Sequence, residues 1–83
     1  MPHREIRKNI DELKTELERT PKETSQFEEL LERAKDGIER YTPETVQDLV
    51  QDLQGEAKEF EVEHPQITAL INQVMTSLSN LGI

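Results

Sequence analysis

The feature that most constrains the fold is the regular spacing of three X-Pro pairs along the chain. Thr20-Pro21, Thr42-Pro43 and His64-Pro65 follow one another at intervals of 22 residues. Proline is favoured in the first turn of a helix, where its missing N–H would have no partner anyway. Inside a helix it removes a hydrogen bond and clashes with the preceding turn, at a cost of about 3 kcal/mol or more. The spacing therefore predicts four helical segments of similar length.

Apolar residues repeat at helical spacing within each of these segments. They recur in alternating steps of four and three residues, which is the heptad spacing of helices that pack at shallow angles. No segment alternates with the period of two that a half-buried strand requires. The pattern predicts an all-α fold, a bundle of three to four antiparallel helices joined by short X-Pro turns, with coiled-coil-like packing. The expected helices span residues 3–19, 21–41, 43–62 and 65–81 of a single domain.

The three proline sites indicate breaks of unequal strength. At Thr42 the hydroxyl can cap the next helix and the heptad changes register, so this site predicts a real turn. At Thr20 the run Thr-Pro-Lys-Glu fits a capping box, with Glu23 reaching back to the Thr20 amide, but the heptad continues through it. The heptad continues through His64 as well. Two architectures stay open: a four-helix bundle within one chain, and a hairpin of two kinked arms, 3–41 and 43–81, that pairs with a second copy.

Composition limits the chemistry that the chain can carry. The 83 residues are 33% apolar and 34% charged, and the net charge is −8. This charge favours solubility and argues against binding to nucleic acid or to anionic membranes. The sequence has no cysteine, which excludes disulfides and thiolate chemistry. Because the charged N-terminus has no apolar run of signal-peptide length, we expect a cytoplasmic location.

The charges are distributed very unevenly along the chain. Every Lys, Arg, Asp and Glu lies between Arg4 and Glu63, so the 20 residues from His64 to Ile83 carry none. This segment is too polar to span a membrane, yet a surface helix normally keeps charge on its water-facing side. We therefore expect it to be covered, either as the central helix of a monomeric bundle or as the seam of an oligomer, and a homodimer is the favoured prediction. The candidate interface is its wide apolar face, formed by Ile67, Leu70, Ile71, Val74, Met75, Leu78 and Leu81.

A row of carboxylates marks one face of the third helix. Its members follow one another in steps of four residues and so line one side of the helix: Glu44, Asp48, Asp52 and Glu56. A solvated face explains such a row, and a docking face for a basic protein partner is the functional alternative. A metal site is disfavoured because one helix seldom brings its side chains together around a cation. An acidic regulator, or a mimic of nucleic acid, follows as the second hypothesis for the chain.

The remaining side chains give little indication of catalysis. His64 stands in the apolar register beside Pro65, and we interpret the pair as a helix junction. A pH-sensitive hinge or a ligand role for His64 is the alternative. The three glycines, at positions 37, 55 and 82, are isolated, so no phosphate-binding loop is present. Since no nucleophile stands with a positioned base, we expect no enzymatic activity, no cofactor and no metal site.

The C-terminal part of the chain resembles a known family. The segment from Phe60 to Ile67, Phe-Glu-Val-Glu-His-Pro-Gln-Ile, and the closing segment from Leu78 to Ile83, Leu-Ser-Asn-Leu-Gly-Ile, are similar to the C-terminal signature of a family of short bacterial proteins. This is the domain-of-unknown-function family numbered four-four-zero-four. The resemblance implies a helical fold and a bacterial cytosolic origin, and it implies no activity, cofactor or catalytic residue. The leading hypothesis for the function is a small acidic helical protein-interaction module that self-associates.

Overall fold

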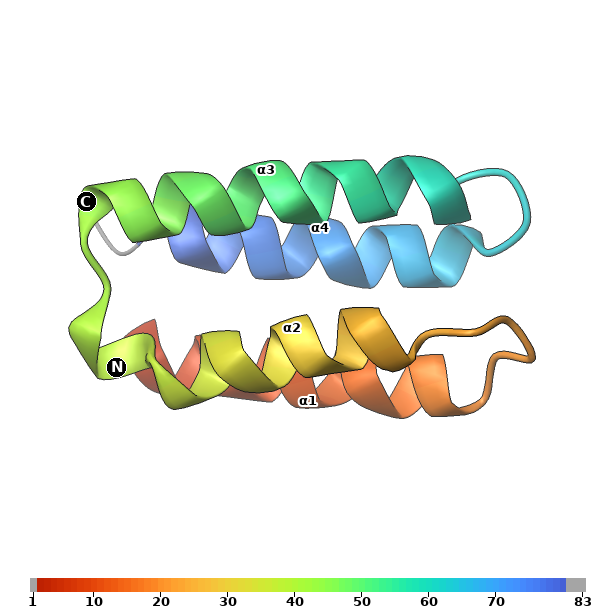
Figure 1. The fold of residues 1–83 in the computed structure, drawn as a ribbon, viewed down its shortest axis with the longest axis horizontal. Coiled ribbons are helices and arrows are strands. Elements are labelled where there is room, and N and C mark those ends of the chain that lie inside the picture. The colour runs from red at the N-terminus through yellow and green to blue at the C-terminus, as the bar shows by residue number, and fades with distance from the viewer. Residues whose placement is uncertain (1, 81–83) are drawn as a thin grey trace.

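The described part of the chain folds into an antiparallel bundle of four α-helices. The structure, a computed structural model, describes residues 2–80. Helix α1 spans Pro2–Glu18, α2 spans Ser25–Asp36, α3 spans Pro43–Phe60 and α4 spans Pro65–Ser79, and a short 3-10 helix, η1 (Ile38–Arg40), follows α2. Figure 1 shows α1 and α2 side by side in one layer, and α3 and α4 side by side in the other. The prediction of an all-α helical bundle is confirmed.

The core lies between the helices and is built from the predicted heptad stripes. Helix α4 packs closely against both α1 and α3, and α1 packs against α2. Burial of one large apolar side chain contributes about 1.5–3 kcal/mol, so the stripes supply most of the energy that holds the helices together. The largest fully buried side chains are Ile6, Ile10, Leu13, Leu17, Leu31, Ile38, Leu53, Phe60, Ile71, Val74 and Leu78.

The turn that leads into α3 has the geometry that the sequence predicts. The Thr42 hydroxyl accepts a hydrogen bond from the Thr45 amide at 3.1 Å, and Pro43 takes the first helical position. Tyr41, just before this cap, is half-buried, and its hydroxyl donates a hydrogen bond to the Ala34 carbonyl. Burial raises the pKa of the Tyr41 phenol to about 12. The turn is therefore fixed by a cap on one side and by a buried phenol on the other.

The turn between α1 and α2 differs from the prediction. Helix α2 begins at Ser25 rather than at residue 21. The Thr20 hydroxyl donates a hydrogen bond to the Glu16 carbonyl at 3.0 Å, so Thr20 belongs to the end of α1 and does not cap α2. Glu23 instead accepts a hydrogen bond from the Ser25 amide at 2.7 Å, and hydrogen bonding from Ser25 lowers the pKa of this carboxyl. Residues 21–24 give the chain the length it needs to reverse direction.

Three helices end two or more residues earlier than the sequence pattern indicates. Helix α2 stops at Asp36 instead of continuing to residue 41, because Gly37 has a low helix propensity and the chain tightens into η1. Ile38 stays buried despite this change. Helices α3 and α4 end at Phe60 and Ser79 rather than at residues 62 and 81. Val62 consequently lies beyond α3 and is 85% exposed.

Candidate functional site

The uncharged final helix is the candidate site, and its apolar stripe is covered by the chain itself. Four residues of the expected interface are at most 3% exposed: Ile67, Ile71, Val74 and Leu78. They lie in the core because α1 and α3 flank α4 on both sides. This placement corrects the expectation that the apolar stripe forms the seam between two copies. Leu70 and Met75 are partly buried at the edges of the stripe, and Leu81 lies outside the described residues.

The opposite surface of α4 is open to solvent and carries no charge. Beyond Pro65, its exposed side chains are amides, hydroxyls and one methyl group: Gln66, Ala69, Asn72, Gln73, Thr76 and Ser79. A partner can cover such a surface without burying an unpaired ion, whose desolvation costs several kcal/mol. The site that the fold offers to a partner is therefore the outer surface of α4 together with its two flanks.

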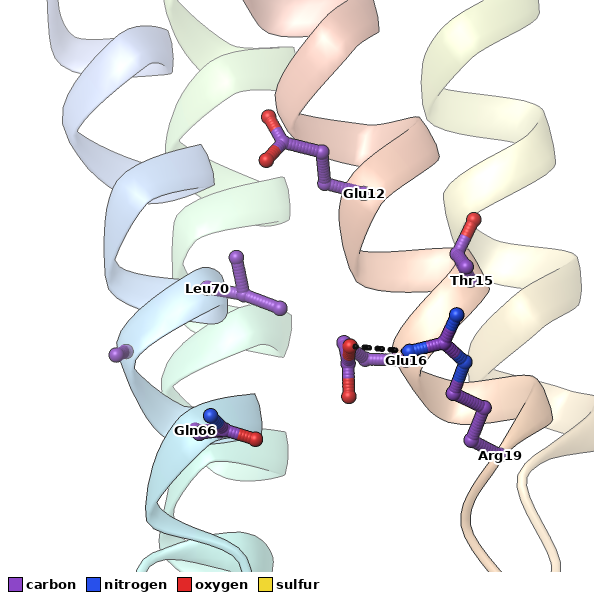
Figure 2. A pocket seen from close by; sticks show the side chains of 7 residues that line it. Glu12, Thr15, Glu16, Arg19, Gln66 and Leu70 are labelled. Atoms are coloured by element: carbon purple, nitrogen blue, oxygen red, sulfur yellow. Dashed lines mark hydrogen bonds and ion pairs between the residues drawn. The ribbon is translucent and has the colours of Figure 1, made fainter.

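The flank that α4 shares with α1 is a shallow groove with a charged rim. Figure 2 shows Leu70 of α4 on one side of this groove, with Glu12 and Glu16 of α1 and, just after the helix, Arg19 on the other. The Arg19 guanidinium lies 3.5 Å from the Glu16 carboxylate. Farther along α1, Glu5 lines the continuation of the groove. A partner that covers this flank has to accommodate three carboxylates and two cationic side chains.

One buried hydrogen bond joins α1 to α4 beneath this flank. The side-chain amide of Asn9 donates to the Ser77 hydroxyl at 2.6 Å. Both side chains are less than a tenth exposed. Among the residues that the structure describes, no buried side-chain nitrogen or oxygen is left without a hydrogen-bond partner. The bond therefore fixes the register of α1 against α4 within an otherwise apolar contact.

The flank that α4 shares with α3 has an uncharged lining. Its groove is lined by Pro43, Val46, Gln47, Val50 and Ser79. Gln54 follows Gln47 by seven residues, or about two helical turns, so it lies on the same side of α3 and is also exposed. Among the described residues, the lining of this groove thus holds no carboxylate, in contrast to that of the α1 flank.

All of α2, α3 and α4 and most of α1 lie within a segment that matches a family model. The model, described as a domain of unknown function (DUF4404), matches residues 6–83. The chain belongs to this family. The family predicted from the C-terminal sequence is thereby confirmed. No curated protein and no solved structure matches the chain.

Sites for other kinds of chemistry are sparse in the described residues of this DUF4404 chain. None of the described helices is both long and apolar enough to cross a membrane. Between residues 2 and 80, no three His, Asp or Glu side chains are grouped so that they can hold a metal ion. The described part of the chain thus gives no positive indication of catalysis.

His64 and Pro65 lie at the junction between α3 and α4 of the DUF4404 chain. The centroid of the His64 ring is 5.9 Å from that of Phe60, which in turn is 6.0 Å from the ring of Phe27. The His64 carbonyl accepts a hydrogen bond from the Ile67 amide at 3.1 Å, and Pro65 takes the first helical position of α4. The ring is therefore packed against an aromatic pair at a helix boundary.

The acidic row of α3 stays at the surface: Glu44, Asp48, Asp52 and Glu56. The first three carboxylates are exposed, whereas Glu56 is partly buried. Burial raises the pKa of the Glu56 carboxyl, and the charges of Glu59 and Asp52 raise it further. Lys22, from the turn between α1 and α2, opposes this rise and lies 3.8 Å from the Glu59 carboxylate. The row therefore leads along α3 toward the turn that carries Lys22.

Two features of the site are not predicted by the sequence pattern. The first is the hydrogen bond between Asn9 and Ser77, although each residue directly precedes a buried apolar one, which signals a position at the edge of the core. The second is the uncharged flank on α3. Glutamine contributes to neither the apolar pattern nor the charge pattern of the sequence. Gln47 and Gln54 can therefore be assigned to an uncharged flank only when the helix that packs beside α3 is known.

Proposed function

We propose that this DUF4404 chain is a small acidic helical protein-interaction module that self-associates as a homodimer through α4 and its neighbouring helices. The observation that carries the proposal is the separation of charge: the exposed side chains of α4 are neutral, in a chain of net charge −8. Two copies of this charge repel one another, so close contact is favoured where the facing surfaces present few carboxylates or set each carboxylate against a cation. The outer surface of α4 meets that condition.

The size of the molecule supports an interface on this side. The bundle measures 33 × 19 × 19 Å. A long face of these dimensions offers roughly the 600 Å² per partner that the smallest standard interfaces bury. A single core in a chain of this length has limited stability, and association of folded copies adds to it.

Size-exclusion chromatography with light scattering tests the self-association. The proposal predicts a particle of twice the 9.6 kDa chain mass at micromolar concentration. Added salt is expected to strengthen the dimer, because it screens the repulsion between two acidic copies. A species of the chain mass alone, from micromolar to millimolar concentration, refutes the proposal.

The exposed acidic row of α3 favours a second candidate function, an acidic regulator that binds a basic protein surface or mimics nucleic acid. Asp48 and Asp52 are both exposed and free of ion pairs with other described residues. This function predicts binding to a lysine-rich peptide that weakens with salt, and that is lost when both aspartates are replaced by lysine. Unchanged peptide binding by the doubly substituted chain would remove the support for this function.

The proposal includes a cytoplasmic location, a bacterial origin and the absence of a catalytic role. A chain without cysteine fits a reducing compartment, since small secreted domains commonly rely on disulfides. The bacterial origin follows only from the resemblance of the C-terminal sequence. Fractionation of bacterial cells that express the chain tests the location, and recovery in the periplasmic or membrane fraction contradicts it.

A further inference from the structure

A second stripe runs along α3, and it is polar. Its members follow one another in steps of three, four, three and four residues: Glu44, Gln47, Gln51, Gln54 and Lys58. This heptad spacing keeps all five on one face of the helix, and all five are exposed. We name this set the glutamine stripe. Its three central members are uncharged, and its two ends carry opposite charges.

The glutamine stripe adjoins the uncharged surface of α4. Gln47 lines a groove together with Ser79, so the stripe lies beside the end of α4. The aspartates of the acidic row, Asp48 and Asp52, each follow a stripe residue and are turned from it by about 100° around the helix. Asp48 stands three residues before Gln51 and therefore lies at the border of the stripe. The stripe thus meets the outer surface of α4 where Gln47 and Ser79 line one groove, and within the stripe charge is present only at its two ends.

Gly55 lies directly after the stripe residue Gln54, and packing within the chain does not require a glycine there. A glycine inside a helix is unfavourable relative to alanine, because it loses more conformational freedom on folding. Apart from its two chain neighbours and the adjoining backbone of α3 itself, a Cβ added at Gly55 would meet no heavy atom within 4 Å. Because Gly55 is exposed, its missing side chain allows the backbone of a second helix to approach α3 closely.

We propose that two copies of the chain pair through their glutamine stripes, with the two α3 helices antiparallel about a two-fold axis near Gln51. The inference rests on the proposed self-association and names its surface. Antiparallel pairing centred on Gln51 brings Glu44 of one copy opposite Lys58 of the other, and the symmetry repeats the pair. Fourteen residues, or about 21 Å of helix, separate the two ends. Neither end makes an ion pair with a described residue of its own chain.

The charge pattern selects this partner and this orientation over others. A parallel pairing sets Glu44 against Glu44, which is repulsive, whereas the antiparallel pairing sets unlike charges together. The flank on α1 presents three carboxylates against two cationic side chains, and so keeps an excess of negative charge toward an acidic second copy. Glutamine amides each carry donors and an acceptor, so two copies of Gln51 at a symmetry axis can hydrogen-bond to one another. A second copy of the chain is thus complementary to the stripe in charge and in hydrogen bonding.

Charge reversal tests the pairing of the stripe ends. Lys58→Glu is expected to raise the dissociation constant of the dimer about tenfold or more, because two attractive pairs become repulsive. Glu44→Lys added to Lys58→Glu restores the opposite charges and is expected to recover most of the affinity. Arg33→Glu, at an exposed position of α2, makes the same change in net charge away from the stripe and from the grooves that flank α4, and serves as the matched control. Sedimentation equilibrium measures the constants, and circular dichroism verifies that each variant is helical.

Cysteine cross-linking tests the position of the axis, since the chain contains no cysteine of its own. Gln51→Cys is expected to form a disulfide-linked dimer on mild oxidation, because the residue lies beside its own copy. Gln26→Cys, at an exposed glutamine of α2, is the matched control and is expected to remain unlinked.

The outcomes separate this inference from the proposed function. A wild-type chain that stays monomeric overturns both. A wild-type dimer in which Lys58→Glu is no more disruptive than Arg33→Glu, or in which Gln51→Cys does not cross-link, overturns the pairing through the stripe and leaves self-association standing.

Discussion

The Asn9–Ser77 hydrogen bond is expected to make a measurable contribution to the stability of the bundle. Ser77→Ala removes the acceptor and leaves the Asn9 amide inside the core, where both side chains are less than a tenth exposed. An unsatisfied buried polar group costs about 1–3 kcal/mol. Each kcal/mol lowers the Tm of a domain of this size by about 4–8 °C, so a loss of about 2 kcal/mol lowers it by roughly 8–16 °C.

A double-mutant cycle separates the lost bond from the stranded amide. Asn9→Leu combined with Ser77→Ala removes both polar groups at similar volume, and its free energy of unfolding is expected to return to within about 1 kcal/mol of wild type. Ser79→Ala, at an exposed serine two residues along, is the control and is expected to change the free energy by less than about 0.5 kcal/mol. Urea denaturation followed by circular dichroism measures all four variants. Strictly additive effects of the two single changes would refute the coupling.

Three further changes follow from the described contacts. Gly55→Ala is expected to raise the free energy of unfolding of the monomer by about 0.5–1 kcal/mol, because alanine favours a helix and the added methyl group meets no neighbouring element. Urea denaturation at a chain concentration below the dimer dissociation constant measures this free energy, and a decrease would show that the methyl group does not fit beside α3. Thr42→Ala removes the cap on the Thr45 amide and is expected to cost about 1 kcal/mol, seen as a lower Tm; an unchanged Tm would show that the cap is dispensable. Because the pKa of Glu56 is raised, the folded chain binds the carboxyl proton of Glu56 more tightly than the unfolded chain does. The ionised carboxylate therefore destabilises the fold at neutral pH, and this destabilisation is lost as the pH falls through the raised pKa. Glu56→Gln is accordingly expected to raise the Tm at neutral pH more than in mild acid, and an equal effect across that pH range speaks against the shift.

The sequence predicts the core well because the core depends on local periodicity. The heptad steps from Ile6 to Leu17 in α1 reappear as fully buried residues in the structure. Thr42-Pro43 is likewise a local signal, since the cap and the proline act within one turn of the helix that they begin.

Features that depend on competition between neighbours are harder to predict. Thr20 has two chemically reasonable roles, and bonding to the Glu16 carbonyl prevails over capping α2. The α-helix ends before Gly37, but the apolar pattern of α2 continues to Ile38, because the 3-10 helix that follows keeps the Ile38 side chain buried. In both cases periodicity alone gives a longer helix than the chain forms.

The candidate site could be predicted only in part, since a surface is defined by what packs beside it. The lack of charge in α4 is visible in the sequence, but its apolar stripe is as consistent with a seam as with a central helix. Ile71 is fully buried because α1 and α3 both flank it, which follows from tertiary arrangement. The glutamines of α3 can be recognised as part of an uncharged surface only because the neutral helix α4 packs beside them.

Dilution of the isotope-labelled chain, followed residue by residue in amide NMR spectra, distinguishes the two flanks of α4 most directly. Pairing through the glutamine stripe predicts that amide shifts of Gln47, Gln51 and Gln54 change with concentration, while those of Glu12 and Glu16 on the α1 flank stay constant. Changes confined to Glu12 and Glu16, or spectra that do not depend on concentration at all, would contradict it.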